Sequence, residues 1–282
     1  MSTLPSKNID EIKFAHELEP LLATEIYVEG STDKELIDSF LKFHGINDIF
    51  IFNIDTVNIP DDIFTKHNSI KSNNKRNHIV VLCHELNEYV FGIIDSDFDY
   101  IQSRKYPPSI IKTDHSAMEM YLFNEKTMEK LFRGYSSIRP DNLNHFLNEM
   151  GKILHEVFLI RYTKEHLEKS ISHRKLESEL SIKKKIIKFD RNTYLKHYLA
   201  SNTEKVKRFN TFIDDTRKKI TVDDFRNYVH GHDFIDFLQA YLDIKHKETR
   251  EHFPKLLYAL LDFDDFNTYS LFVNIKNLSN KE

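Results

Sequence analysis

The chain has 282 residues, of which 40% are hydrophobic and 30% charged, with only 6 glycines and 7 prolines. This composition is typical of a globular, helix-rich protein and excludes a disordered or collagen-like chain. The single cysteine, Cys83, excludes an intramolecular disulfide and a cysteine-rich zinc site. Residues 1–14 contain no apolar run that could serve as a signal peptide, and apolar runs elsewhere are too short to span a bilayer. The expected location is therefore the cytoplasm, away from the membrane.

Charge is unevenly distributed along the chain, although the net charge is only −4. Residues 1–120 hold 11 Lys and Arg against 20 Asp and Glu, a net charge of −9, whereas residues 183–219 hold 12 against 4, a net charge of +8. This distribution suits a protein that binds metal in one part and phosphates in another. Two solvated helix faces would produce the same pattern.

Hydrophobic periodicity predicts alternating strands and helices in the first part of the chain. In chain order the pattern predicts a strand at 24–29, a helix at 32–44, a strand at 49–54, a loop at 56–72, a helix at 74–86, strands at 89–95 and 110–113, and a short helix at 116–124. Thr32 and Glu35 form a capping-box pair for the first helix, and Gly45 fits its C-terminal cap. The alternation predicts an α/β fold, with a parallel sheet and flanking helices over residues 20–125.

Residues 126–282 are predicted to form a mainly helical C-terminal region. Apolar residues keep helical spacing over four turns of the segment 143–158. Further helical segments are expected at 192–200, 203–219, 222–229, 233–244 and 249–262. We expect this region to pack on the sheet or extend from it, and to contact the substrate, a partner or a second copy of the chain.

Acidic residues stand where two of the predicted strands end. In open α/β sheets, sites form just beyond the carboxyl ends of the strands. Glu29 and Asp95 stand at the ends of the first and third predicted strands, and Gly30 allows a sharp turn after Glu29. Asp95, Asp97 and Asp99 alternate, and residues two apart in an extended segment point the same way. If the two strands are neighbours, up to four carboxylates converge.

A cluster of carboxylates favours a bound cation, because like charges repel and otherwise some of the groups must protonate. Mg²⁺ is the natural cation for an all-oxygen site that keeps waters and accepts phosphate oxygens of a substrate, and Mn²⁺ is the expected substitute. Two such ions about 3.5–4 Å apart can activate an attacking water and stabilise a leaving oxygen. The sequence therefore predicts a metal-dependent phosphodiesterase in which Glu29 is a metal ligand or a general base.

Two known acidic motifs share part of this pattern but do not fit the chain. An EF-hand loop also begins with DxDxD, but its Gly at position six and Glu at position twelve are Tyr100 and Tyr106 here, which excludes that loop. A haloacid-dehalogenase-like phosphatase also has a strand ending in DxD, but Phe98 and Asp99 stand where that family usually has a Thr, and Glu29 would have no role. For the DxD alone, helix caps and turns remain the alternative.

Two motifs resemble the Toprim domain: YVEGSTDK at 27–34 and GIIDSDFD at 92–99. Topoisomerases, bacterial primases, small ribosomal-RNA maturases and OLD-type nucleases share this fold. Its pattern is a Glu-Gly at the first strand and a DxD at a later one, both serving Mg²⁺. The resemblance covers residues 20–125 and implies a metal-binding nuclease domain, with Glu29, Asp95 and Asp97 as catalytic residues and metal ligands, and Asp99 as a supporting ligand.

Two further stretches, TDHSAMEMYL at 113–122 and GHD at 231–233, extend the resemblance to the AriB-type Toprim effectors of the PARIS anti-phage defence systems. This resemblance implies a toxic nuclease that acts in abortive infection. An ABC-type, AriA-like ATPase partner encoded nearby would hold it inactive until infection. The implied substrate is transfer RNA, and we expect a homodimer in the active form. That family commonly has Glu-Asn where this chain has Glu119 and Met120, so Glu119 is a weaker candidate ligand than Glu29.

Several absences agree with this interpretation. No GxxxxGK followed by Ser or Thr occurs, so the chain is not itself an OLD-type ATPase fusion. One cysteine excludes a zinc ribbon of the primase kind, and 282 residues leave little room for the strand-passage domains of a topoisomerase. Two alternatives remain: a small Toprim RNA maturase that acts on a ribosomal precursor, and a non-catalytic Toprim docking module for an ATPase.

Basic residues supply the candidate nucleic-acid contacts, which are Lys34, Lys183, Lys184, Lys185 and Lys188. Lys34 sits one turn past Gly30, where it could reach a phosphate at a helix N-terminus or remain a surface lysine. The other four open the basic stretch. That stretch could hold an RNA backbone while the metal acts, or dock on an acidic face of the ATPase partner.

Three further patterns are predicted to be structural. His230 and His232 could bind metal, but Gly231 ending one helix and Asp233 starting the next would account for the same residues through capping. Cys83 falls among apolar residues of a predicted helix and is expected to be an inert core residue. The acidic LDFDDF at 261–266 is predicted to be a turn at a helix end.

Overall fold

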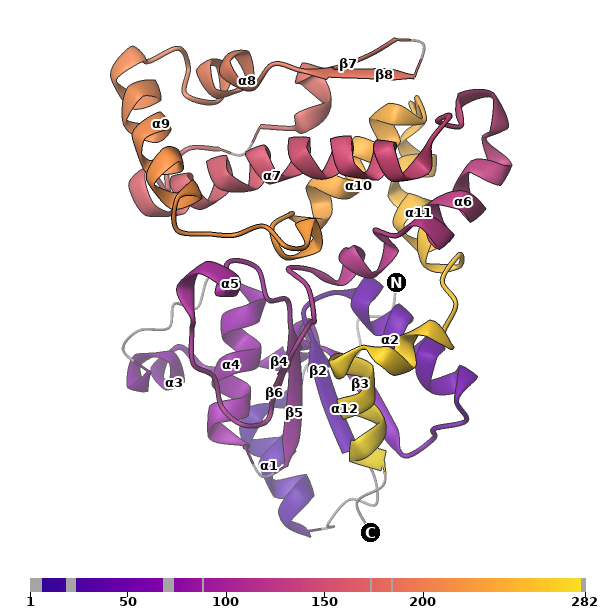
Figure 1. The fold of residues 1–282 in the computed structure, drawn as a ribbon. Helices are drawn as coiled ribbons and strands as arrows, with labels where there is room; N and C mark the ends of the chain where they lie inside the picture. Colours follow the sequence, from indigo (N-terminus) through magenta and orange to yellow (C-terminus); the bar gives the residue numbers. More distant parts are fainter. Residues whose placement is uncertain are drawn as a thin grey trace. The chain divides into compact units, whose positions relative to one another are not determined.

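The computed structural model describes residues 7–18, 24–67, 74–87, 89–172, 174–183 and 185–279. The chain divides into two compact units, whose elements are labelled in Figure 1. The sheet unit comprises residues 1–95, 104–114 and 262–282, and the helical unit comprises residues 96–103 and 115–261. The chain therefore leaves the sheet unit twice and returns to it twice.

The sheet unit alternates strands and helices, with 3₁₀ helices labelled η. Its elements are β1 (Lys7–Asn8), α1 (Ile9–Leu18), β2 (Thr24–Val28), α2 (Ser31–Phe43), β3 (Ile49–Asn53), η1 (Ile54–Thr56), β4 (Val57–Asn58), α3 (Asp61–Lys66), α4 (Lys75–Glu85), β5 (Val90–Ile94), β6 (Ile110–Lys112), η6 (Asp265–Thr268) and α12 (Ser270–Ser279). The predicted loop at 56–72 was wrong in part, because it contains β4 and the short helix α3, whose Ile63 and Phe64 are buried. Residues 68–72 of that loop lie outside the described residues.

Four parallel strands form the main sheet in the order β3-β2-β5-β6. The predicted α/β fold with a parallel sheet and flanking helices is confirmed. Chain order gives β2 as the first strand and β5 as the third of this sheet, and the two are hydrogen-bonded neighbours, with Tyr27 opposite Gly92. Because the strands are parallel, their carboxyl ends lie at the same edge of the sheet. A separate short parallel pair joins β1 to β4.

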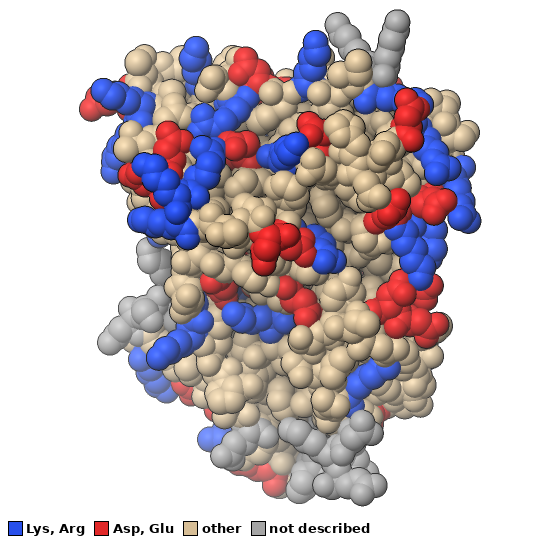
Figure 2. Space-filling view, in the orientation of Figure 1, with Lys and Arg blue, Asp and Glu red and all other residues tan. Residues whose placement is uncertain are grey.

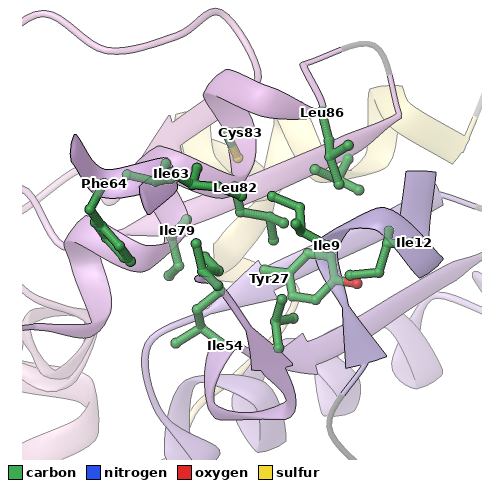
Figure 3. Packing of buried hydrophobic residues seen from close by; sticks show 14 of the residues in the cluster. Ile9, Ile12, Tyr27, Ile54, Ile63, Phe64, Ile79, Leu82, Cys83 and Leu86 are labelled. Carbon is green, nitrogen blue, oxygen red and sulfur yellow. The ribbon is translucent and has the colours of Figure 1, made fainter. Parts of the chain in front are cut away.

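One face of the sheet is covered by α1, α3 and α4. Figure 3 shows the Tyr27 ring reaching from β2 toward Ile9 and Ile12 of α1, within a buried cluster that also includes Leu82 and Cys83 of α4. Burial raises the pKa of the Cys83 thiol to about 12. A thiol this buried and this weakly acidic is not a nucleophile at neutral pH, in agreement with its interpretation as a core residue.

The last part of the chain belongs to the sheet unit. Figure 1 shows α12, in yellow, beside the strands formed by the first part of the chain. The Phe272 ring of α12 contacts the Phe40 ring of α2, with ring centroids 4.7 Å apart. Asp114, just after β6, accepts hydrogen bonds from the backbone N–H groups of Ser270 (2.7 Å) and Leu271 (3.0 Å). A carboxylate from a distant segment therefore caps the N-terminus of α12.

Replacing this cap should destabilise the protein. We expect Asp114→Ala to lower the free energy of unfolding by about 0.5–2 kcal/mol, because two N–H groups at the start of α12 lose their acceptor. Asp114→Asn keeps one oxygen acceptor and should lose less. Urea denaturation of the two variants and the wild type measures the difference. Equal stability of all three proteins would contradict the capping role.

The helical unit is built around one long helix. Its elements are α5 (Asp99–Gln102), η2 (Met118–Leu122), α6 (Glu125–Gly134), η3 (Ser136–Ile138), α7 (Leu143–Leu167), η4 (Leu176–Glu179), β7 (Leu180–Lys183), β8 (Ile186–Phe189), α8 (Arg191–Tyr198), α9 (Thr203–Arg217), η5 (Phe225–Asn227), α10 (Gly231–Tyr241) and α11 (Lys247–Tyr258). The Phe146 ring of α7 packs on Tyr241 of α10 (centroids 4.7 Å apart) and on Phe132 of α6 (5.5 Å). These aromatic contacts join the neighbouring helices α6 and α7 to α10, which is far from them in the sequence.

Two features of the helical unit differ from the sequence predictions. The segment 180–189 forms an antiparallel hairpin of β7 and β8, which hydrophobic periodicity did not predict, because its strands are short and lysine-rich. The predicted helix at 222–229 is only the 3₁₀ turn η5. Its N-cap residue is Asp224, whose Oδ1 accepts a hydrogen bond from the backbone N–H of Arg226 at 2.9 Å. Among the described residues, no helix combines the length and the apolar character needed to cross a membrane.

Candidate metal centre

Glu29 and Asp95 lie together at the carboxyl edge of the sheet. Glu29 directly follows β2, and Asp95 directly follows its neighbour β5. The backbone N–H of Asp95 lies 3.4 Å from Oε1 of Glu29, which accepts its hydrogen bond. Both side chains are half-buried. The structure therefore brings the Glu29 carboxylate to the main chain of Asp95, so the two residues that the sequence placed at neighbouring strand ends lie side by side.

Gly30 has a different role from the predicted one. Its backbone is extended (φ −130°, ψ 157°), so no sharp turn requires glycine here. Gly30 is the N-cap of α2, and its N–H donates to Oδ2 of Asp33 at 3.0 Å. The predicted capping pair of Thr32 and Glu35 is wrong by two residues, because the helix begins at Ser31. A Cβ on Gly30 would lie 3.1 Å from Oδ2 of Asp33, so glycine leaves room for the capping carboxylate.

Asp97 and Asp99 belong to the helical unit, and only Ser96 separates Asp97 from Asp95. Asp97 has a left-handed backbone (φ +42°), and its N–H donates to the carbonyl of Ser116 at 2.7 Å. Asp99 is buried and opens the short helix α5. The prediction of an extended segment in which the three aspartates point the same way is therefore wrong, because the chain turns at Asp97. Non-glycine residues in this conformation store strain, often at functional sites.

Glu119 lies in η2, where its side chain is 17% exposed. Burial raises the pKa of Glu119, and the negative charge of Asp97 raises it further, whereas His232 acts in the opposite direction. Nδ1 of His232 lies 4.0 Å from Oε1 of Glu119. The negative charges of Glu119 and Asp97 therefore repel each other within the helical unit, as expected for two carboxylates near a cation site.

The GHD motif does not cap two helices as predicted. Gly231 is the first residue of α10 rather than the end of an earlier helix, and His230 is the N-cap residue. A Cβ on Gly231 would lie 2.0 Å from Oε2 of Glu119. Asp233 forms an ion pair with Arg161 of α7. Sequence reasoning missed Arg161 and the contact of Gly231. In the sequence, the glycine between His230 and His232 is the feature that could have indicated a close contact at this position.

The chemistry of the donors fits Mg²⁺. Every predicted ligand is a carboxylate, and oxygen ligands are what this hard cation prefers. Glycine at position 231 also leaves space for the Glu119 carboxylate, because a Cβ there would lie only 2.0 Å from Oε2 of Glu119. In the described part of the chain, no three or more His, Cys, Asp or Glu side chains stand close enough to form a ready metal-binding group. The carboxylates divide between the units, with Glu29 and Asp95 in one and Asp97, Asp99 and Glu119 in the other.

Lys34 makes contacts within the sheet unit. Its Nζ donates to Oδ2 of Asp38 at 2.9 Å and to the carbonyl of Ile51 at 2.5 Å. The second of these bonds links α2 to β3. They give Lys34 a structural contact in addition to the phosphate contact predicted for it.

The basic stretch forms the β7–β8 hairpin and helices α8 and α9, and many of its charges are paired. Lys183 ends β7, Lys184 lies outside the described residues, and Lys185 has a left-handed backbone (φ +67°) at the turn. Nζ of Lys185 lies 2.8 Å from Oδ1 of Asp141, while Lys188 is exposed on β8. Figure 2 shows basic and acidic side chains interleaved at the upper left, over α9.

The acidic partners of these basic residues lie on α9, on α7 and at Glu168, which directly follows α7. Arg217 lies 2.8 Å from Glu156, Lys218 3.1 Å from Asp215, and Lys205 3.1 Å from Glu168. Because these acidic partners partly neutralise the basic residues, the positive electrostatic potential here is lower than the net charge of residues 183–219 predicts.

Comparisons with known proteins do not assign a family. No family model matches the chain, and no curated protein matches it at a significant level. The interpretation of the site therefore depends on the residues and contacts described above.

Proposed function

We propose that the protein is a Mg²⁺-dependent phosphodiesterase with a Toprim-like sheet unit. The observation that carries this proposal is the contact of Glu29 with Asp95 at the carboxyl edge of a parallel sheet. Sites of open α/β sheets form at that edge. A carboxylate fixed at that edge against the main chain of a second acidic residue is better suited to binding a cation than to packing a core.

In this proposal Glu29 and Asp95 hold the metal at the edge of the sheet unit, and the metal-binding roles of Asp97, Asp99 and Glu119 are those that the Toprim resemblance implies. Bound Mg²⁺ would supply positive charge that offsets the phosphate charge and lowers the pKa of water. The protein's own contribution is orientation: the Asp95 N–H directs the Glu29 carboxylate, and the hydrogen bond from Asp97 to Ser116 fixes the turn of the DxD segment. Such fixed groups need no rearrangement when the substrate binds.

We infer that the substrate is RNA, with transfer RNA as the first candidate, and that an ABC-type ATPase partner restrains the activity in anti-phage defence. The support is the resemblance of the motifs around Glu29 and Asp95 to Toprim effectors. The exposed Lys188 and the unevenly distributed positive charge of residues 183–219 suit a polyanionic substrate.

Metal binding and cleavage together test this function. We expect Mg²⁺ or Mn²⁺ to stabilise the wild type by up to about 2.7 kcal/mol at a hundredfold excess over Kd, because the ligand binds only the folded state. The variant Asp95→Asn with Asp97→Asn should lose both this stabilisation and Mg²⁺-dependent cleavage of transfer RNA. Asparagine is chosen because it tolerates the left-handed backbone of Asp97.

A matched control is Asp61→Asn with Asp62→Asn, which removes two exposed carboxylates of the first turn of α3. It should keep the metal response. The proposal fails if metal stabilises wild type and the Asp95/Asp97 variant equally, or if the wild type leaves RNA intact with Mg²⁺ after separation from its ATPase partner. Ribosomal precursor cleaved in preference to transfer RNA would indicate a maturase instead.

A further inference from the structure

Gly231 opens α10 directly against the carboxylate of Glu119. A Cβ at this position would lie 2.0 Å from Oε2, 2.5 Å from Cδ of Glu119 and 3.0 Å from Cβ of Ala117. The backbone of Gly231 is not in the left-handed region, so space rather than conformation requires glycine. Any side chain here would have to displace the Glu119 carboxylate.

Two residues further on, Asp233 anchors the same helical turn. Its side chain is fully buried (0% exposed), and Arg161 of α7 is 15% exposed. Nη2 of Arg161 donates to Oδ1 at 2.6 Å, and Nε lies 2.6 Å from Oδ2. Arginine contacts both oxygens, and such a two-point contact fixes orientation as well as distance. The turn that carries Gly231 is therefore tied to the longest helix of the unit.

A buried ion pair is a poor way to gain stability, because desolvation of both charges cancels much of their attraction. Apolar side chains of similar volume would stabilise the contact between α7 and α10 as well. The pair instead supplies a fixed position for the first turn of α10. That turn meets Glu119 through Gly231, and Nδ1 of His232 lies 4.0 Å from the same carboxylate.

We propose that Arg161, Asp233 and Gly231 form a positioning element that holds the Glu119 carboxylate in place for metal binding. The inference rests on the proposed function, since it takes Glu119 as one of the metal ligands predicted for that function. Arg161 and Asp233 are positioning residues, because they act through the helical turn and do not themselves serve as ligands.

Calorimetric titration of the full-length protein with Mn²⁺ alone tests the inference. We expect Gly231→Ala to raise the Mn²⁺ dissociation constant by about tenfold or more, which is the usual effect of disturbing the groups that orient a ligand. The matched control is Gly134→Ala, since a Cβ on Gly134, the last residue of α6, meets nothing within 4 Å. This control should bind Mn²⁺ as the wild type does. Circular dichroism and melting temperature show that each variant is folded.

Arg161→Lys provides a second variant, because it keeps the charge but cannot contact both oxygens of Asp233 in the same fork. It should also weaken Mn²⁺ binding while remaining folded. If Gly231→Ala does not fold, the Mn²⁺ affinity of Arg161→Lys alone tests the inference. Wild-type affinity in the folded variants overturns the inference. If the wild type binds Mn²⁺, Glu29→Gln weakens binding and both positioning variants bind normally, only this inference fails. If the wild type binds no Mn²⁺, the proposed function fails as well.

Discussion

The Glu29→Gln variant is expected to lose roughly a hundredfold or more of the Mg²⁺-dependent cleavage rate while keeping the wild-type fold. Changes to groups that merely orient metal ligands cost about 10–100-fold, so loss of a ligand or general base should cost at least as much. Glutamine has the same shape as glutamate and keeps an oxygen that can accept the Asp95 N–H, which lies 3.4 Å from Oε1 in the wild type. The variant therefore removes the charge and preserves the contact.

The fold should tolerate this change because Glu29 is half-buried at a strand end and is not part of the buried core. Without metal, removal of one of two neighbouring carboxylates should leave the melting temperature unchanged or raise it, since like charges repel. Single-turnover cleavage of transfer RNA and a melting curve in EDTA measure the two effects.

Glu17→Gln is the matched control for this variant. It makes the same change of charge at an exposed position of α1. The end of this helix lies near the beginning of β2, where His16 is 3.7 Å from Glu25, whereas Glu29 follows the end of that strand. The control should cleave at the wild-type rate. A Glu29→Gln variant that remains as active as Glu17→Gln would remove Glu29 from the catalytic site.

The sheet and its acidic edge could be predicted from the sequence because both depend on local patterns. The apolar run before Asp95 is a buried strand, and the alternation of strands with helices requires parallel pairing. Parallel neighbours end at the same edge, so the meeting of Glu29 with Asp95 follows from strand order. The left-handed backbone of Asp97 could not be predicted, because it depends on a hydrogen bond to the distant Ser116.

Other parts of the molecule depend on contacts between distant segments. Asp114 caps a helix that begins at Ser270, which assigns the end of the chain to the sheet unit. The interaction of Arg161 with Asp233 joins residues 72 positions apart. Pairing within the basic stretch has the same origin, since Arg217 meets Glu156 of another helix. No pattern in a short window of sequence contains these pairs, so charge counting overestimated the positive potential of residues 183–219.

Gly92 occupies the most crowded position among the glycines of the sheet unit. It lies in β5, three residues before Asp95, between the neighbouring strands β2 and β6. A Cβ at Gly92 would lie 2.3 Å from Cγ2 of Ile79, 2.7 Å from Cδ1 of Ile110 and 2.9 Å from Sγ of Cys83. Ile79 and Cys83 are fully buried on α4, so neither can move into solvent. Only glycine therefore lets α4 pack this closely on β5.

We expect Gly92→Ala to lower the free energy of unfolding by about 1–3 kcal/mol, because an added methyl group in a packed core forces side chains from their preferred rotamers. Gly134→Ala should instead raise the free energy of unfolding by about 0.4–1 kcal/mol, since its methyl group meets open space and restricts only the unfolded chain.

The double variant Gly92→Ala with Ile79→Ala tests the contact itself. The nearest colliding group is absent from it, so its loss of unfolding free energy should be smaller than the sum of the losses of the two single variants. Urea denaturation of the four variants and the wild type measures this coupling. Additive losses would show that α4 does not contact β5 through Ile79 and Gly92. A Gly92→Ala variant as stable as Gly134→Ala would contradict the close packing itself.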